Sequence, residues 1–342
     1  MPHISRKKLT YKVDASLREY LQQYGRALAL PIQYRDLKRY KDAVTLYDKS
    51  NRDTLWVSLI YPPEDLKHIH GALKEIYAIL RANGDLSVMQ HLYVDRVDLC
   101  LYGNTNPFRV RIVNRINDNF DYFYIKNADA SRVYGLELEG LLSPNRVSYV
   151  VHEETLIEEH IAGIPGEEFI QSYLQPGRVE NETRLAKEFV KFNERCFVRL
   201  LGDMHSSNYV VEILPDFDDV HYRIRAIDFD QQSYEPRKSI YMPQYYKKNM
   251  PIIEVGIRHM NNTTVRQYQK EERAMIASRI RYSLRQVMDL MAVMSRTPLS
   301  KPEYVEQLRR ELAQHHKCDA FLRCNTMGAI VRQSLKLLIE NN

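Results

Sequence analysis

The sequence is poor in glycine, in cysteine and in long apolar runs. Glycine accounts for 12 of 342 residues, about half the usual ~7%. The chain contains neither G-x-G-x-x-G nor G-x-x-x-x-G-K-[ST], which excludes a glycine-rich phosphate loop of standard sequence. Four cysteines are too few for a disulfide scaffold, and this favours a reducing, cytoplasmic location. No apolar run approaches the ~20 residues of a membrane-spanning helix, and the N-terminus lacks the pattern of a secretory signal.

The charge is modest overall but uneven along the chain. Lys and Arg number 49 and Asp and Glu 44, a net charge of +5, while residues 1–52 alone hold 12 basic and 5 acidic residues, net +7. A basic leader can contact nucleic acid or an anionic membrane surface. Here the charges interleave with Leu17, Tyr20, Leu21 and Tyr24 at helical spacing, which favours a solvated helix. We therefore expect no nucleic-acid partner and leave open a weak contact with a membrane surface.

Apolar periodicity predicts an ordered succession of helices and strands. A helix over 14–29, a strand over 54–61 and a helix over 64–82 come first. Three short strands follow, over 93–102, 108–114 and 122–126. A helix over 131–142 and two more strands, over 147–152 and 155–161, come next. Beyond Gly163 a helix over 182–199 leads to a hairpin over 209–227, and helices fill 265–294, 303–316 and 326–340. This order predicts an N-terminal extension (1–90), a small β-rich lobe (91–162) and a larger helical lobe (163–342).

The strongest chemical signal lies around the predicted hairpin. An apolar run delivers Asp203 and, five residues later, Asn208, and the hairpin then returns Asp228 to the same end. Phosphoryl transfer from ATP requires a carboxylate to accept the proton of the attacking hydroxyl, and oxygen ligands that hold Mg²⁺ on the phosphates. Three residues of these types at one end of a hairpin therefore indicate a phosphotransferase.

The same residues resemble a known family. Gly202-Asp203-Met204-His205-Ser206-Ser207-Asn208 is similar to the H-G-D-x-H-x-x-N loop of the protein-kinase-like superfamily, in its aminoglycoside phosphotransferase and choline kinase branch, and Ile227-Asp228-Phe229-Asp230 to that branch's metal motif. The resemblance covers roughly residues 93–295 and implies an α+β, bilobal kinase-like fold. It makes Asp203 the catalytic base, and Asn208 and Asp228 the Mg²⁺ ligands. The sequence departs from the family at Leu201, where a histidine is expected to anchor the loop.

The family template also points to residues upstream. Lys126, at the end of the third short strand, matches the phosphate-binding lysine. Its acidic partner is expected in the next helix, where Glu137 is preferred over Glu139 because it shares a face with apolar neighbours. The run 156–163 resembles the hinge that binds adenine, through the Glu159 carbonyl and the Ile161 amide. The turn at Gly103 and Thr105 would then take the place of the glycine loop.

The roles of two side chains near the motifs, His205 and Asp230, each have two interpretations. His205 is either a polar anchor of the loop or a contact to the acceptor. Asp230 either supports the metal-binding carboxylate from behind or is a solvated loop residue. The sequence does not separate these alternatives.

These features predict an ATP- and Mg²⁺-dependent transferase that phosphorylates a hydroxyl of a small molecule, saccharide or lipid. No A-P-E block follows Asp228, so we prefer a small acceptor over a protein, although a protein kinase stays an alternative. A second alternative is a pseudokinase, a binding scaffold without chemistry. Leu201 and the poor glycine loop favour that alternative, whereas intact Asp203, Asn208, Asp228 and Lys126 oppose it.

Overall fold

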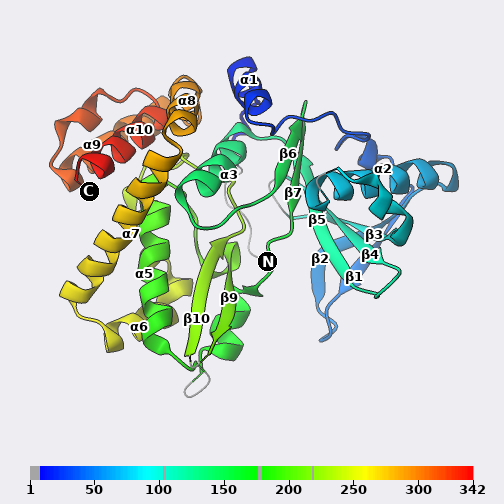
Figure 1. The fold of residues 1–342 in the computed structure, drawn as a ribbon, viewed down its shortest axis with the longest axis horizontal. Helices are drawn as coiled ribbons and strands as arrows, with labels where there is room; N and C mark the ends of the chain where they lie inside the picture. Colours follow the sequence, from blue (N-terminus) through cyan, green and yellow to red (C-terminus); the bar gives the residue numbers. More distant parts are fainter. Residues whose placement is uncertain (1–7, 83, 103–104, 176–178, 218, 342) are drawn as a thin grey trace. The chain divides into compact units, whose positions relative to one another are not determined.

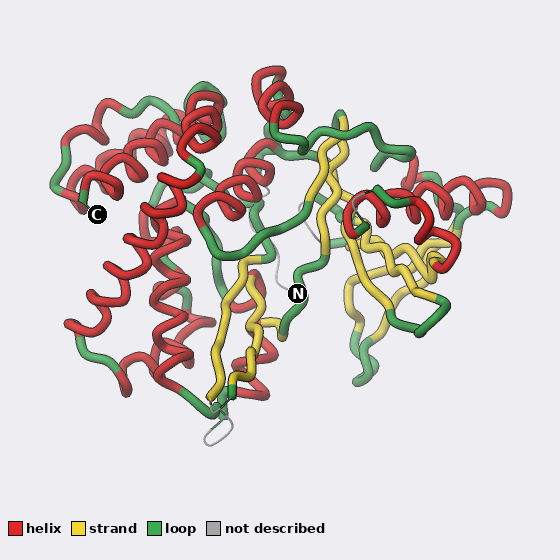
Figure 2. Tube along the Cα trace, in the orientation of Figure 1, coloured by secondary structure: helices red, strands yellow, loops and turns green. Residues whose placement is uncertain are grey.

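The computed structural model describes residues 8–82, 84–102, 105–175, 179–217 and 219–341. The chain divides into two compact units, one of residues 1–129 and 147–160 and the other of residues 130–146 and 161–342. The large sheet lies in the first unit, and most of the helices lie in the second (Figures 1 and 2). The α+β class expected from the sequence is confirmed.

The first unit is built on one antiparallel sheet of seven strands in the order β1-β2-β3-β4-β5-β7-β6. The strands are β1 (Asp42–Tyr47), β2 (Asp53–Ile60), β3 (Leu92–Cys100), β4 (Phe108–Asn114), β5 (Phe120–Asn127), β6 (Tyr149–His152) and β7 (Thr155–Glu159). The short runs predicted from β-branched and aromatic residues lie at these positions. The chain leaves the sheet after β5 and returns at β6. Strand β5 pairs with β7, and Lys126 near the end of β5 lies opposite Leu156 of β7.

An amphipathic helix, α2 (Pro63–Arg81), covers part of this sheet and contacts β3 and β4. Its apolar residues Ile69, Leu73 and Ile76 are buried in one core with side chains of the strands, such as Val110 and Ile125. Each side chain of this size contributes about 1.5–3 kcal/mol when fully buried. The helix expected over 64–82 is thus the main cover of the sheet's core.

The N-terminal residues do not form a separate extension. Strands β1 and β2 continue the sheet, because β2 pairs with β3 at Val57 and Leu99. The expected domain boundary at residue 90 therefore lies inside a single sheet. The strand β1 lies in a stretch for which the sequence predicted none. The basic leader is also partly structural, because Lys8 lies buried in an ion pair with Asp129 at 2.6 Å.

The first helix is shorter than expected. Periodicity predicted a helix up to residue 29, but α1 (Ala15–Gln23) begins at an Asp14 cap and ends before Gly25, which has a φ of +68°. Only glycine adopts such a conformation without strain. The chain then extends, and Ala27 bridges Val151 of β6.

The second unit is helical apart from one small sheet of β8, β9 and β10. Its elements are α3 (Ala130–Leu142), β8 (Ile164–Pro165), α4 (Gly166–Glu168), α5 (Glu182–Arg199), β9 (Tyr209–Asp216), β10 (Asp219–Ala226), α6 (Met250–His259), α7 (Asn262–Tyr282), α8 (Leu284–Met294), α9 (Pro302–His316) and α10 (Met327–Glu340). Helix α5, capped by Asn181, packs on α6, α7 and β10. It is therefore the central support of this unit.

The second unit decides one open expectation and differs from two others. The stretch 265–294, predicted to be one long helix or two, contains two, α7 and α8, separated at Ser283, whereas α6 was not predicted. Helix α3, expected inside the small lobe, belongs to the second compact unit. No helix in the described part of the chain is both long and apolar enough to cross a bilayer.

Candidate active site

The loop that carries Asp203 begins where α5 ends. Leu200 closes the helix in the left-handed conformation, with a φ of 58°, and Asp203 has a φ of 60°. Between them Gly202 is closely confined, because a Cβ there would lie 3.1 Å from the Gln231 carbonyl oxygen. Aspartate tolerates the left-handed conformation better than most residues with a side chain. The backbone therefore turns sharply to present the Asp203 carboxylate.

Residues 231–249 anchor this loop where the family would use a histidine. Leu201 is fully buried and bridges Gln232. The side chain of Gln232 donates to the last carbonyls of α5, and the Tyr246 hydroxyl accepts from the Asp203 amide at 2.9 Å. Buried Asn249 donates to the Met204 carbonyl at 2.9 Å. The contacts of Gln232, Tyr246 and Asn249 thus hold the loop in place of the histidine that was expected at position 201.

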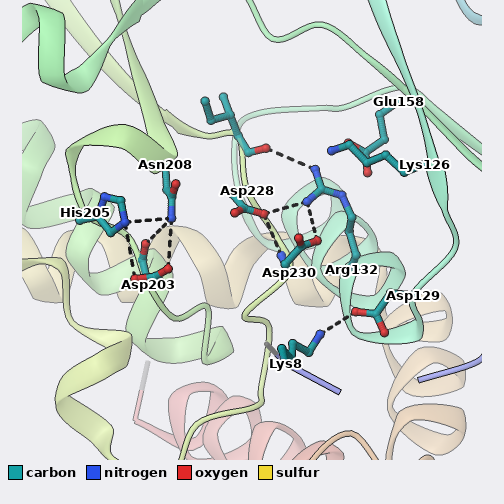
Figure 3. Close-up of polar contacts among 11 residues, drawn as sticks. Lys8, Lys126, Asp129, Arg132, Glu158, Asp203, His205, Asn208, Asp228 and Asp230 are labelled. Carbon is teal, nitrogen blue, oxygen red and sulfur yellow. Dashed lines mark hydrogen bonds and ion pairs between the residues drawn. The ribbon is translucent and has the colours of Figure 1, made fainter. Parts of the chain in front are cut away.

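The side chains of the loop form a polar cluster (Figure 3). The Asn208 amide nitrogen donates to the Asp203 carbonyl oxygen at 2.8 Å and lies 3.4 Å from the Asp203 carboxylate. His205 lies 3.7 Å from the same carboxylate and within 3.5 Å of Asn208. Nδ2 of Asn208 donates to a backbone carbonyl, and only an oxygen can bind Mg²⁺. Oδ1 of Asn208 is therefore the atom that could coordinate a metal ion. His205 caps the turn by accepting from the Ser207 amide, a contact in keeping with a loop anchor.

The environment of Asp203 favours its protonated form. Burial, followed by the negative charges of Asp228 and Glu235, raises the pKa of Asp203 to about 7. The side chain is still 42% exposed. A carboxylate with a pKa near neutrality that remains accessible has the properties of a general base.

Asp228 follows β10 and lies close to this loop. The Ile227 amide donates to the Asn208 carbonyl at 3.0 Å, which joins the two segments. Oδ1 of Asp228 accepts from Nη1 of Arg132 at 2.8 Å and from the Asp230 amide at 3.0 Å. The structure thus brings Asp203, Asn208 and Asp228 together within the second unit.

Arg132 of α3 connects the two carboxylates of the 227–232 segment. Its Nη1 also lies 2.8 Å from Oδ1 of Asp230, and its Nη2 lies 3.4 Å from the Ile227 carbonyl oxygen. Asp230 is 8% exposed, so it is not a solvated loop residue. The interpretation of Asp230 as a support for Asp228 accounts for these contacts.

The donor types around the Asn208 and Asp228 side chains suit Mg²⁺. The ion prefers hard oxygen ligands and is usually held by one or two protein groups, with phosphates and water completing the shell. An amide oxygen with a fixed orientation and a carboxylate anchored through one oxygen meet that requirement. Among the described residues, no group of three or more His, Cys, Asp and Glu side chains is arranged to hold a metal ion.

Lys126 of the first unit forms a different ion pair from the one expected. It is 8% exposed and its Nζ lies 2.9 Å from Oε2 of Glu158, a residue of β7. Glu139 is paired with Arg199 and accepts from Ser143 at 2.6 Å. Glu137 is buried and accepts from Gln286 at 3.3 Å. Since Lys126 and Glu137 belong to different units, their pairing stays a prediction.

The remaining predicted positions belong to turns and strand ends. Gly103 lies outside the described residues. The carbonyls of Thr105 and Asn106 accept from the Tyr34 hydroxyl at 3.2 and 2.9 Å, so the N-terminal region holds the turn proposed to replace the glycine loop. The Glu159 side chain accepts from Arg81 and from the Ser148 amide, both at 2.8 Å. Ile161 is the first residue of the second unit after β7, and the adenine-binding role of both stays a prediction.

Several residues of the site were missed from the sequence. Arg132 was detectable in principle, because an arginine beside Val133, Tyr134 and Leu136 in a mostly apolar helix requires a buried partner. The sequence showed Glu158 only as one of two adjacent acidic residues at the end of a predicted strand, and gave no sign of its pairing with Lys126. For Gln232, Tyr246 and Asn249 the sequence offers no local signal, since their partners are backbone groups distant in the chain.

Comparison with known proteins finds similarity in structure only. No family model and no curated protein matches the sequence. Among solved structures, the Helicobacter pylori proinflammatory kinase CtkA is 11% identical, with a TM-score of 0.31 over 67% of this chain and 94% of that chain. The autoinhibited serine kinase domain of the giant muscle protein titin is 13% identical, with a TM-score of 0.28 over 72% and 92%. Titin kinase with its flanking domains is 14% identical, with a TM-score of 0.27 over 72% and 54%.

Proposed function

We propose that this protein transfers the terminal phosphoryl group of ATP to a hydroxyl of a small molecule, saccharide or lipid. The observation that carries the proposal is the convergence of Asp203, Asn208 and Asp228 in one unit, with the pKa of Asp203 raised to about 7. The different surroundings of the two carboxylates, one with a pKa near neutrality and one beside a buried cation, support a catalytic role for this cluster.

In the proposed reaction Asp203 accepts the proton of the acceptor hydroxyl. The hydroxyl oxygen forms a bond to the γ-phosphorus while the bond from that phosphorus to the β,γ-bridging oxygen breaks, and ADP leaves. Asn208 Oδ1 and Asp228 are the residues that would hold Mg²⁺, whose charge neutralises the phosphate oxygens. His205, beside the Asp203 carboxylate, keeps the turn in place. Lys126 of the first unit is proposed to bind phosphate oxygens.

The preference for a small acceptor is supported by the segment after Asp228. In residues 231–249 the side chains of Gln232, Tyr246 and Asn249 are used to hold the catalytic loop. This stretch consists of short turns rather than an extended surface on which a peptide would lie. We therefore place small hydroxyl compounds ahead of proteins as acceptors.

The direct test is phosphate transfer from γ-labelled ATP to a panel of sugars, amino alcohols, lipids and a generic protein substrate. We expect Mg²⁺-dependent transfer to one class of small acceptor and its loss in Asp203→Asn. Transfer to the protein substrate alone would show that the acceptor is a protein and not a small molecule. Binding of Mg²⁺-nucleotide without turnover on any acceptor would instead support a pseudokinase.

A further inference from the structure

Arg132 is the most enclosed charged group beside the candidate metal ligands. Its side chain is 2% exposed, whereas Asp228 is 36% and Asp230 11% exposed. One nitrogen, Nη1, lies 2.8 Å from both carboxylates. A buried guanidinium is stable only when it is paired and hydrogen-bonded. The two carboxylates in turn need positive charge nearby, because like charges at this spacing repel each other.

The N-terminal half of helix α3 contacts the 227–232 segment at more residues than Arg132. The Ser131 hydroxyl donates to the Gln232 carbonyl at 2.7 Å. A Cβ on Gly135 would lie 2.9 Å from the Cβ of Phe229, so the absence of a side chain there lets the helix approach Phe229. Three residues in the first two turns of α3, Ser131, Arg132 and Gly135, therefore fix the segment that presents Asp228.

We propose that Arg132 is a positioning residue for the metal site. Before a metal binds, its guanidinium supplies the positive charge that keeps Asp228 and Asp230 assembled. It does so by donating to Oδ1 of Asp228 and to Oδ1 of Asp230. The identity of the metal as Mg²⁺ rests on the proposed function, but the role of Arg132 in holding the segment does not.

This role differs from that of a competing cation. A competitor would have to leave Asp228 before the metal binds, so its removal would strengthen metal binding. A positioning residue stays in place, and its removal weakens metal binding. Outer contacts to metal ligands typically change metal affinity by about 10–100-fold when they are removed. The sign of the change thus separates the two roles.

The test compares Arg132→Gln and Arg132→Lys with Arg195→Gln. Arg195 is a matched control, since it is also a buried arginine between two carboxylates, Glu188 at 2.6 Å and Glu272 at 3.5 Å, and its own contact with β10, to the Ile224 carbonyl at 3.3 Å, precedes the 227–232 segment. Two quantities are measured. The first is amide hydrogen exchange of the metal-free protein over 227–232, and the second is the affinity for a non-hydrolysable ATP analogue with Mg²⁺ and with EDTA.

We expect Arg132→Gln to speed exchange over 227–232 and to weaken the Mg²⁺-dependent part of the affinity about 10–100-fold, with Arg132→Lys intermediate. Arg195→Gln should lower stability but change neither quantity. Wild-type exchange and affinity in Arg132→Gln, or tighter Mg²⁺-nucleotide binding, would overturn the proposal. If Arg132→Gln does not fold, Arg132→Lys carries the same test. If the wild type binds no Mg²⁺-nucleotide, the proposed function fails, while the exchange measurement still decides whether Arg132 holds the segment.

Discussion

The two acidic segments of the second unit are held by opposite means. The loop over 200–208 is fixed by neutral hydrogen bonds, from the Asp203 amide to the Tyr246 hydroxyl and from the Asn249 side chain to the Met204 carbonyl. The segment over 227–232 is fixed by a buried cation, Arg132. Burial and neighbouring negative charge therefore favour the protonated form of Asp203, while Asp228 stands beside a positive charge. The difference shows how two aspartates in one site are suited to two tasks, one to accept a proton and one to bind a metal.

The largest expected effect comes from removing the proton acceptor. Asp203→Asn keeps the size of the side chain and its place in the loop but cannot take the proton of the hydroxyl. Turnover should fall by about 10²–10⁴-fold, with the free energy of unfolding little changed. Steady-state phosphate transfer and chemical denaturation measure the two quantities. A variant that retains wild-type turnover would remove Asp203 from the role of base.

The contact of α3 with the metal-binding segment is tested by a glycine pair in one helix. A methyl group at Gly135 would press on Phe229, whereas Gly140 has open space. Gly135→Ala should cost about 1–3 kcal/mol of stability through overpacking, and it should weaken Mg²⁺-nucleotide binding. Gly140→Ala should raise stability by about 0.5–1 kcal/mol. Equal effects of the two substitutions on stability and binding would show that α3 does not position the segment.

The neutral anchoring of the catalytic loop predicts a smaller effect for Tyr246→Phe. The Asp203 amide would lose its 2.9 Å partner and keep only the longer, 3.3 Å contact to the Ile240 carbonyl. We expect a loss of about 1 kcal/mol in stability and a several-fold loss of turnover without a change in Mg²⁺ affinity. The neighbouring Tyr245 is 59% exposed, so Tyr245→Phe is the control. If both variants behave alike, the hydroxyl of Tyr246 is not an anchor.

The pH dependence sharpens the same comparison. Burial and the charge of Asp228 favour protonated Asp203, so the base is ionised only as the pH rises through about 7, and kcat/KM should rise over that range. Because the folded protein binds this proton more tightly than the unfolded chain, the free energy of unfolding should fall as the pH rises from the ordinary aspartate pKa of 3.8 to about 7. In metal-free Asp228→Asn the pKa of Asp203 should fall, because one like charge is removed. Carbon-13 NMR of the aspartate carboxyls measures it, and an unchanged pKa would contradict the predicted coupling.

Local sequence patterns predicted most of the elements but not the contacts between them. Helix α5 lies at the residues expected from its periodicity, and the Asp203, Asn208 and Asp228 triplet was found because its spacing in the loop and hairpin is local. The early end of α1 depends on Gly25 and on a bridge to Val151, which periodicity does not reveal. The partners of Lys126 and Asp228, Glu158 and Arg132, lie 32 and 96 residues away in the chain. Side-chain pairing at such distances is set by packing and was not visible in the sequence.

The central claim, that Asp203 and Asp228 have different tasks, is tested most directly by one binding measurement on two variants. Calorimetric affinity for a non-hydrolysable ATP analogue is compared with and without Mg²⁺ in Asp203→Asn and Asp228→Asn. We predict that Asp203→Asn keeps the Mg²⁺-dependent gain in affinity, whereas Asp228→Asn loses about tenfold or more of it. Equal losses in both variants, or a loss confined to Asp203→Asn, would contradict the account.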